Sequence, residues 1–186
     1  YNLKERLDRA KINFKTIMIG SCYYIPNFEI PGTSCSKYFQ QNMKNEILNE
    51  KKSIVILGGY LTYYLKNEQF IGNQNKEIDE SIKDSIIHLL NKNHKVVLIY
   101  PSPAFDVHVP QTIFNLLKKE LLFRLDKKDI ELKLSKNLIT KDYDDYKREN
   151  AKVFKIFDKI EHENLYKIYP HTLFCNTYVE NKCSAN

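Results

Sequence analysis

Short, mostly apolar runs alternate along this chain with amphipathic segments of helical length, and this alternation restricts the fold more than any other feature. The runs are FKTIMI at 14–19, SIVIL at 53–57, KVVLIY at 95–100 and LYKIY at 165–169. A run that is apolar throughout is typical of a parallel strand buried on both faces. Strands that alternate with helices indicate right-handed βαβ units, and so a parallel sheet with helices on both sides.

Helical periodicity fills the segments between these runs. In the first such segment Met43 and Ile47 lie four residues apart and so share a face, and Ser34 or Ser36 is suited to cap its N-terminus. The sequence therefore predicts one α/β domain over 1–186, with helices near 36–50, 78–91, 111–125 and 143–162.

Charge and hydropathy exclude several classes of protein. The formal net charge is +6, but the basic residues are scattered and form no block of five or six like charges. Nucleic-acid binding is therefore not predicted, whereas an anionic glycan or lipid surface is compatible with this charge. The sequence has no apolar run of the roughly 18 residues that span a bilayer. It opens on the polar segment YNLKERLDRA, so any targeting signal is expected outside this chain unless the protein is cytosolic.

Four cysteines fall into two local pairs, Cys22 with Cys35 and Cys175 with Cys183. The sequence contains no CxxC and no histidine at metal-ligand spacing beside them, so no metal site is predicted. Two short disulfides and an oxidising compartment are the favoured interpretation. The alternative is four unrelated thiols in a cytosolic protein.

Functional residues in parallel α/β sheets gather in the loops that follow the carboxyl ends of the strands. After the second run, Gly58 and Gly59 could leave backbone N–H groups free to stabilise an oxyanion, or could simply form a tight turn that needs positive φ. Tyr60 belongs to the same candidate oxyanion or substrate loop. Tyr60 and the tyrosines that follow at 63 and 64 are nevertheless expected to pack more often than to touch a ligand.

Other polar residues in these loops are weaker candidates. Asp106 and His108 resemble a base with its orienting carboxylate, but such spacing is common in loops. His171 could hydrogen-bond a loop as easily as it could act in catalysis. Ser21 directly follows the first run, yet no base is evident for it and no GxSxG elbow surrounds it. The residues alone therefore give an α/β domain with no complete catalytic set.

Four segments, taken together, resemble the SGNH-hydrolase-like domains that are fused to membrane acyltransferase-3 proteins. They are SCYYIPNFEIPGTSCSKYF, SIVILGGYLTYYL, KVVLIYPSPAFDVHVP and LYKIYPHTLFCNTYVENKC. The last is the most specific, with its strand, Pro, Leu-Phe-Cys and closing Cys. The resemblance implies a three-layer α/β/α, flavodoxin-like fold. Relatives often carry Arg or Trp near the turn at Tyr60, so the resemblance assigns no substrate contacts there.

In that family the catalytic serine stands in a Gly-Asp-Ser-His block on the first strand, and the catalytic Asp and His stand in an Asp-x-x-His block after the last cysteine. Neither block occurs in this sequence. The chain is therefore expected to be a central fragment without catalytic residues of its own, with the first strand and the last catalytic loop missing, and to be inactive alone.

The resemblance also implies a function. It predicts O-acylation, usually O-acetylation, of cell-envelope glycans such as lipopolysaccharide or exopolysaccharide by a periplasmic domain of an inner-membrane protein. The partners would be a membrane acyltransferase domain in the same polypeptide and the glycan acceptor, with no cofactor. A non-catalytic periplasmic glycan-binding module is the alternative.

Overall fold

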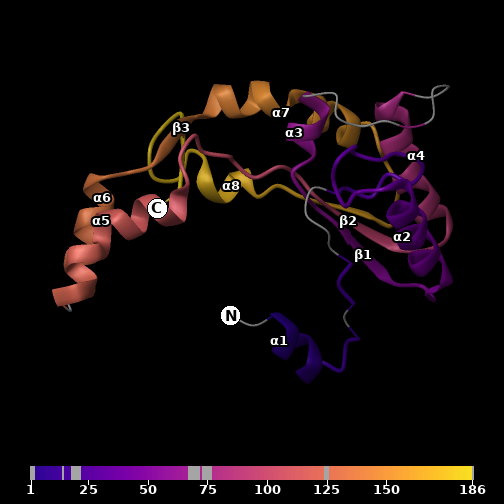
Figure 1. The fold of residues 1–186 in the computed structure, drawn as a ribbon, viewed down its shortest axis with the longest axis horizontal. Helices are drawn as coiled ribbons and strands as arrows, with labels where there is room; N and C mark the ends of the chain where they lie inside the picture. Colours follow the sequence, from indigo (N-terminus) through magenta and orange to yellow (C-terminus); the bar gives the residue numbers. More distant parts are fainter. Residues whose placement is uncertain are drawn as a thin grey trace.

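The computed structural model describes residues 3–13, 15–17, 22–66, 72, 77–123 and 126–185, without the side chains of 3, 4, 64 and 119–123. Its centre is a three-stranded parallel sheet in the order β1 (Ile54–Leu57), β2 (Lys95–Ile99) and β4 (Leu165–Ile168) (Figure 1). The register aligns Val55 with Val96 and Val96 with Leu165. The predicted α/β class and parallel sheet are confirmed and agree with a three-layer α/β fold.

The strand predicted over 14–19 falls largely outside the described residues. Only 15–17 are described, and they are not in a strand. They are preceded by a short helix, α1 (Leu3–Arg9), which lies beyond the edge of the main body in Figure 1. Within the described part of the chain, β1 therefore has a paired edge against β2 and an edge with no partner strand.

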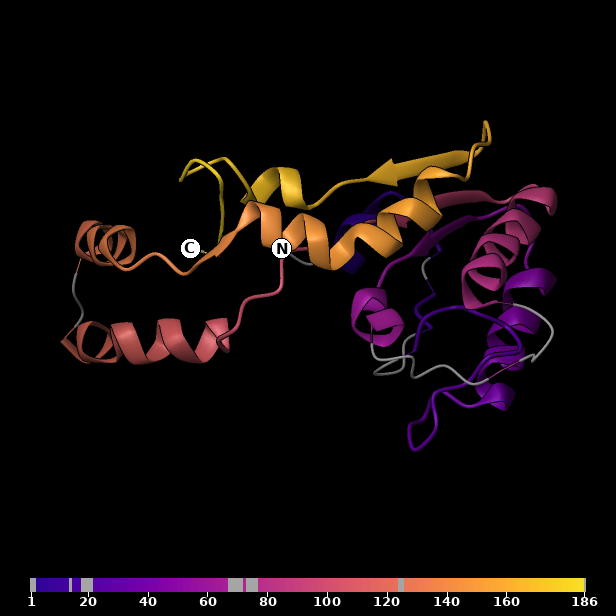
Figure 2. The same cartoon turned by 90° about the horizontal axis from the view of Figure 1, so that it is seen from above.

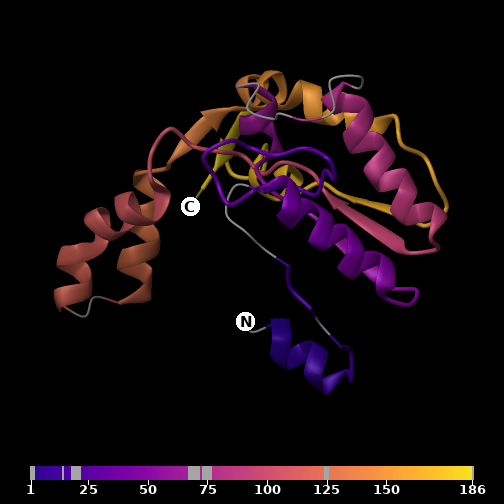
Figure 3. The ribbon, with the colours of Figure 1, turned by 45° about the vertical axis from the view of Figure 1, so that its right-hand side comes forward.

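One layer of helices covers one face of the sheet. It consists of α2 (Lys37–Asn49), α3 (Leu61–Lys66), α4 (Ile78–Asn91) and α7 (Tyr143–Asp158). The Ser36 side chain caps α2 by accepting a hydrogen bond from the Phe39 N–H, as the sequence suggested. Ile82 and Ile86 of α4 are fully buried with Val96 and Leu98 of β2, so the core lies between this layer and the sheet (Figure 3).

The opposite face of the sheet is apolar and largely uncovered by described residues. Strand residues alternate between faces, and the register places Ile56 beside Val97 and Tyr166 on this second face. Ile54 is 67% exposed, Ile56 53% and Tyr166 46%. Such a face on a central parallel sheet normally packs against a second helical layer.

The direction of the connections between the strands explains why the described helices cover one face of the sheet. The chain crosses the sheet in one direction, from β1 through β2 to β4. Right-handed connections made in one direction place their helices on the same face, which is where α4 and α7 pack together. A helix on the second face would require a connection that runs across the sheet in the opposite direction.

Two further helices project from this body as an arm. They are α5 (Val109–Phe123) and α6 (Lys127–Lys136), which lie side by side to the left of the sheet in Figures 1 and 2. The sequence predicted α5 near 111–125, whereas it left the region of α6 unassigned. None of the side chains of α6 is buried. The arm is therefore held to the body mainly through the segments that lead into and out of it.

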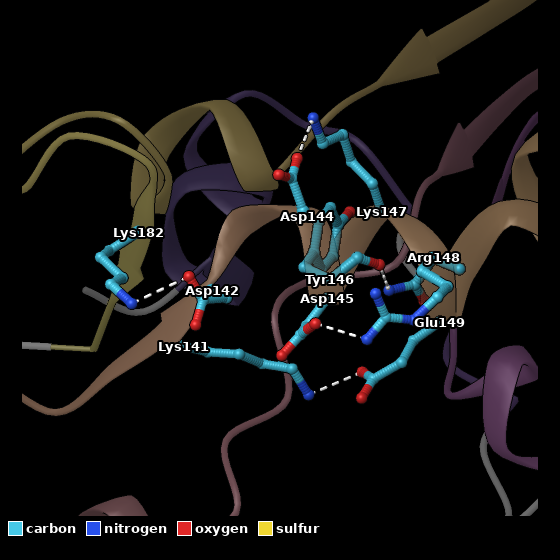
Figure 4. A network of polar contacts seen from close by, with 10 residues as sticks. Lys141, Asp142, Asp144, Asp145, Tyr146, Lys147, Arg148, Glu149 and Lys182 are labelled. Atoms are coloured by element: carbon cyan, nitrogen blue, oxygen red, sulfur yellow. Dashed lines mark hydrogen bonds and ion pairs between the residues drawn. The ribbon is translucent and has the colours of Figure 1, made fainter.

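The C-terminal region forms a small unit of its own. A short helix, α8 (His171–Phe174), leads into an antiparallel ribbon of β3 (Thr140–Asp142) and β5 (Lys182–Ser184). Figure 4 shows the ion pairs that surround this ribbon and the start of α7, including Lys182 with Asp142 at 2.8 Å and Lys141 with Glu149 at 2.6 Å. The part of the chain after β4 is thus partly ordered into helix and strand.

Candidate functional site

The Gly58–Gly59 loop lies at the carboxyl end of β1, and close packing on both sides explains its two glycines. A Cβ at Gly58 would lie 3.3 Å from the Ile99 Cβ. Gly59 has φ +156°, and a Cβ there would lie 3.4 Å from the Tyr23 ring. The turn therefore needs glycine at 59 for its backbone conformation. Gly59 is exposed, and its N–H has no backbone acceptor among the residues described.

Tyr60 and Tyr63 form a stacked pair directly beyond these glycines. Their ring centroids are 5.7 Å apart and their planes differ by 16°. Tyr60 is 53% exposed and Tyr63 is 44% exposed. The two rings therefore pack against each other at the surface, with Tyr63 on α3 and Tyr60 just before its first residue. The side chain at 64 lies outside the described residues.

The short helix α3 holds this loop in place. Leu61 and Leu65, four residues apart, are both buried in the core. Between them, the Thr62 hydroxyl donates a 2.5 Å hydrogen bond to Oδ1 of Asn150 on α7. The Asn150 amide in turn donates to the Tyr146 carbonyl at 2.7 Å. The buried side chains of α3 and the Thr62–Asn150 hydrogen bond thus fix the helix that carries the exposed Tyr63 and follows Tyr60.

A disulfide-bonded loop covers the other side of the glycines. Cys22 and Cys35 are joined, as predicted, and their Cα atoms are 5.0 Å apart. The fully buried Gln40 of α2 ties this loop to the body, because its side chain accepts from the Ile25 N–H at 2.9 Å and donates to the Tyr23 carbonyl at 2.6 Å. Burial raises the pKa of Tyr23, so its ring stays neutral against Gly59.

Sequence reasoning missed Gln40 and Asn150, although both left a signal. Each is a polar residue at a position of a helical stripe that is otherwise apolar: Gln40 shares its face with Met43 and Ile47, and Asn150 with Tyr146 and Val153. A polar side chain at such a position is buried and needs hydrogen-bond partners. Gln40 bonds to the loop closed by Cys22 and Cys35, and Asn150 bonds to Thr62 on α3. Both sets of partners adjoin the Gly58–Gly59 loop.

The loop after β2 does not join Asp106 and His108 into a catalytic pair. His108 Nδ1 accepts a hydrogen bond from the Gln111 N–H at 3.2 Å, so the imidazole caps the start of α5. Asp106 is exposed, and no hydrogen bond joins it to His108 in the described part of the chain. The loop is instead fixed by Tyr146, whose hydroxyl donates to the Pro101 carbonyl at 2.6 Å.

His171, after β4, is enclosed by aromatic rings. Its imidazole lies 5.3 Å from the Tyr146 ring, 5.6 Å from Phe154 and 6.0 Å from Tyr169, between ring centroids. Its Nδ1 is buried without a partner among the described residues, and burial lowers the pKa of the imidazole. This environment favours a neutral packing residue over a general base.

Other candidate nucleophiles and metal ligands do not form a site. Ser21 lies outside the described residues. A cavity of about 250 Å³ between the first disulfide loop, α2 and α4 is lined by Ser85 and His88, among others. The Ser85 hydroxyl donates to the Ser81 carbonyl at 2.6 Å, so His88 does not activate it. The residues that the structure describes contain no cluster of three or more potential metal ligands.

The comparison with known families identifies the domain. No described helix is long and apolar enough to cross a membrane. The second disulfide joins Cys175 to Cys183, and the two disulfides fit a domain outside the cytoplasm. No curated protein and no solved structure matches the chain. A family model described as the SGNH domain fused to AT3 domains matches residues 1–186. That fusion supports an acyl-transfer or esterase-like module with a membrane acyltransferase domain in the same polypeptide, and the chain belongs to this SGNH family.

Proposed function

We propose that this domain takes part in transferring an acyl group, in the simplest case acetyl, to hydroxyls of a cell-envelope glycan such as lipopolysaccharide or exopolysaccharide. The observation that carries the proposal is the match to the AT3-fused SGNH family along residues 1–186. The two disulfides support a periplasmic position, where an inner-membrane partner could pass the acyl group outward.

The catalytic serine, histidine and aspartate of this mechanism lie outside the 186-residue sequence, which contains neither Gly-Asp-Ser nor a late Asp-x-x-His. The serine oxygen would attack the carbonyl of the acyl donor and give its proton to the histidine, which the aspartate orients and which passes the proton to the departing donor group. The glycan hydroxyl would then attack the acyl-serine carbonyl and give its proton to the histidine, which returns it to the serine oxygen as the glycan ester leaves. In this chain, the Gly59 N–H is suited to stabilise the oxyanion that forms in both steps.

The uncovered face of the sheet also supports the proposal that the catalytic blocks lie outside this sequence. The free edge of β1 can accept another parallel strand, and a connection in the opposite direction would place a helix on the apolar face. A strand beside β1 would carry its last residues to the same sheet edge as Gly58 and Gly59. A serine there would thus lie next to the candidate oxyanion loop.

The Tyr60–Tyr63 pair supports a sugar acceptor. Both rings are about half exposed, next to the glycine loop, and held by the buried base of α3. The face of an aromatic ring is electronegative and attracts the weakly positive C–H groups of a sugar ring. We assign this pair as the platform on which the acceptor sugar stacks.

The test uses a polypeptide in which this chain is joined to the Gly-Asp-Ser-His and Asp-x-x-His blocks that the proposal requires, called the longer polypeptide. Tyr60→Ala is expected to raise KM for the glycan acceptor about tenfold, the equivalent of ~1.4 kcal/mol of stacking. Hydrolysis of a small acetyl ester should keep its rate, because such an ester does not need the platform. Tyr178→Ala is the matched control, since Tyr178 is 75% exposed on the C-terminal loop. If the parent, Tyr60→Ala and Tyr178→Ala have equal KM for the glycan acceptor, the Tyr60–Tyr63 pair is not a sugar-binding platform.

A non-catalytic glycan-binding module is the second candidate, favoured by the absence of any complete catalytic set in the sequence. It predicts that the longer polypeptide binds the glycan through Tyr60 and transfers no acyl group. Acyl transfer that depends on the Gly-Asp-Ser serine would exclude this candidate.

A further inference from the structure

The α5–α6 arm exposes apolar side chains that the body does not cover. Phe114 of α5 and Leu132 of α6 are each 54% exposed. Among the described side chains of α5 only Leu117 is buried, and α6 buries none. A ten-residue helix without a buried side chain obtains little stability from its own domain. A surface outside the domain would give these apolar residues a place to pack.

Basic residues accompany these apolar positions. From Val109 to Lys136 the sequence has seven Lys or Arg and four Asp or Glu, an excess of three positive charges. The basic ones are Lys118, Lys119, Arg124, Lys127, Lys128, Lys133 and Lys136. The arm therefore complements an anionic surface rather than a basic or neutral one.

The spacing along each helix places lysines on the same face as exposed apolar residues. Lys128, Leu132 and Lys136 are four residues apart and share one face of α6, and all three are exposed. Phe114 and Lys118 have the same relation on α5. A large apolar side chain flanked by lysines is the pattern of helices that lie in a membrane interface, where the apolar group enters the acyl boundary and the lysines reach the phosphates.

We propose that the α5–α6 arm docks on the anionic phospholipid surface of the membrane. A membrane acyltransferase domain in the same polypeptide keeps this domain close to a bilayer, which makes lipid a constant neighbour of the arm. The arm extends away from the sheet and its helical layer (Figure 2), so docking would leave the Gly58–Gly59 loop uncovered. This proposal is independent of the acyl-transfer chemistry.

A single tryptophan makes the contact measurable, because the natural chain has none. In the purified 186-residue chain, the Phe114→Trp variant is titrated with vesicles of phosphatidylcholine, alone or mixed with phosphatidylglycerol. We expect a blue-shifted emission, and quenching by brominated acyl chains, with the mixed vesicles only. Tyr38→Trp is the matched control, since Tyr38 is 77% exposed on α2 in the body, and its emission should not change.

Charge reversal tests the lysines. The Lys128→Glu/Lys136→Glu variant in the Phe114→Trp background should bind the mixed vesicles at least about 25-fold more weakly, from roughly fivefold per lysine, and added salt should weaken the parent similarly. Lys51→Glu/Lys92→Glu makes the same charge change on exposed body lysines and should bind like the parent. Circular dichroism confirms that each variant is folded.

Three results would overturn the proposal. The first is an unshifted Phe114→Trp emission with mixed vesicles. The second is an equal loss of binding in the Lys51 and Lys92 variant, which would show only a general charge effect. The third is a Phe114→Trp shift that requires the detergent-solubilised membrane domain and does not occur with lipid, which would make the arm a protein-binding element.

Discussion

The Thr62 hydroxyl on α3 donates a 2.5 Å hydrogen bond to Oδ1 of Asn150 on α7, across 88 residues of sequence. This bond fixes the helix that begins directly after the Gly58–Gly59 loop to the longest helix of the domain. Thr62→Val keeps the shape of the side chain and removes the donor. We expect it to cost about 1–3 kcal/mol of unfolding free energy, because the buried Asn150 oxygen loses its partner.

Urea denaturation measures that cost. Thr172→Val is the control, since the Thr172 hydroxyl donates to the Tyr169 carbonyl at an exposed position, where water can replace it. It should change stability by less than about 0.5 kcal/mol. A Thr62→Val protein as stable as its parent would mean that the α3–α7 bond does not hold the loop.

The parallel sheet was predictable because its strands leave a continuous apolar signal, on the face that packs in the core and on the face that the described helices leave uncovered. β1 and β2 lie within one residue of the predicted runs, and α4 has the predicted bounds of 78–91. Each of these elements packs in the core, so its pattern in the sequence reflects what it touches. The disulfide pairing followed from the short loops that each pair closes.

The second helix of the arm, α6, and the loop helix, α3, were not predictable for physical reasons. Ile130, Leu132 and Leu134 alternate with polar residues, which is the period of a strand, yet they lie on α6, a helix that buries none of its side chains. α3 falls in an aromatic stretch next to two glycines, and tertiary packing of Leu61 and Leu65 makes it helical. The three-residue strands of the C-terminal ribbon are too short to show a period.

The enclosed His171 makes stability depend on pH. Burial lowers the pKa of its imidazole below the ordinary 6.5, so it is neutral in the fold. As pH falls through about 6.5 the unfolded chain takes up the proton first, so unfolding is favoured and stability declines toward acid. The urea concentration at the midpoint of unfolding should therefore fall as the pH is lowered from 8 to 5. It should fall less in His171→Gln than in the parent.

A second histidine serves to check this assignment. His88 also has a lowered pKa, from burial and from the charges of Lys44 and Lys92, so His88→Gln should remove a separate part of the slope. If the stability of His171→Gln depends on pH as steeply as that of the parent, the fold does not hold the His171 imidazole neutral.

The 186-residue chain alone should not hydrolyse a simple acetyl ester. Its sequence has no Gly-Asp-Ser block, Asp106 does not pair with His108, and Ser85 is bonded to a backbone carbonyl. An oxyanion site at Gly59 without a nucleophile can bind but cannot turn over substrate. The measurement is release of chromophore from an aryl acetate by the purified chain, compared with buffer. Robust turnover that Ser21→Ala abolishes would place the nucleophile in this chain.

The two disulfides should contribute unequally to stability. The chain-entropy model gives about 3 kcal/mol for the loop closed by Cys22 and Cys35 and about 2.5 kcal/mol for that closed by Cys175 and Cys183, which are 13 and 8 residues apart. The first loop also covers Gly59 with Tyr23, so its reduction should loosen the candidate site.

Paired Cys→Ser variants separate these effects. Cys22→Ser/Cys35→Ser should lower the unfolding free energy and speed amide exchange around Gly59. Cys175→Ser/Cys183→Ser should act mainly on the β3–β5 ribbon, because Cys183 itself lies in β5. Peptide mapping without reductant should recover only the two local pairs. Four free thiols in protein from its native compartment would contradict both the pairing and the periplasmic assignment, since an oxidising environment would have joined them.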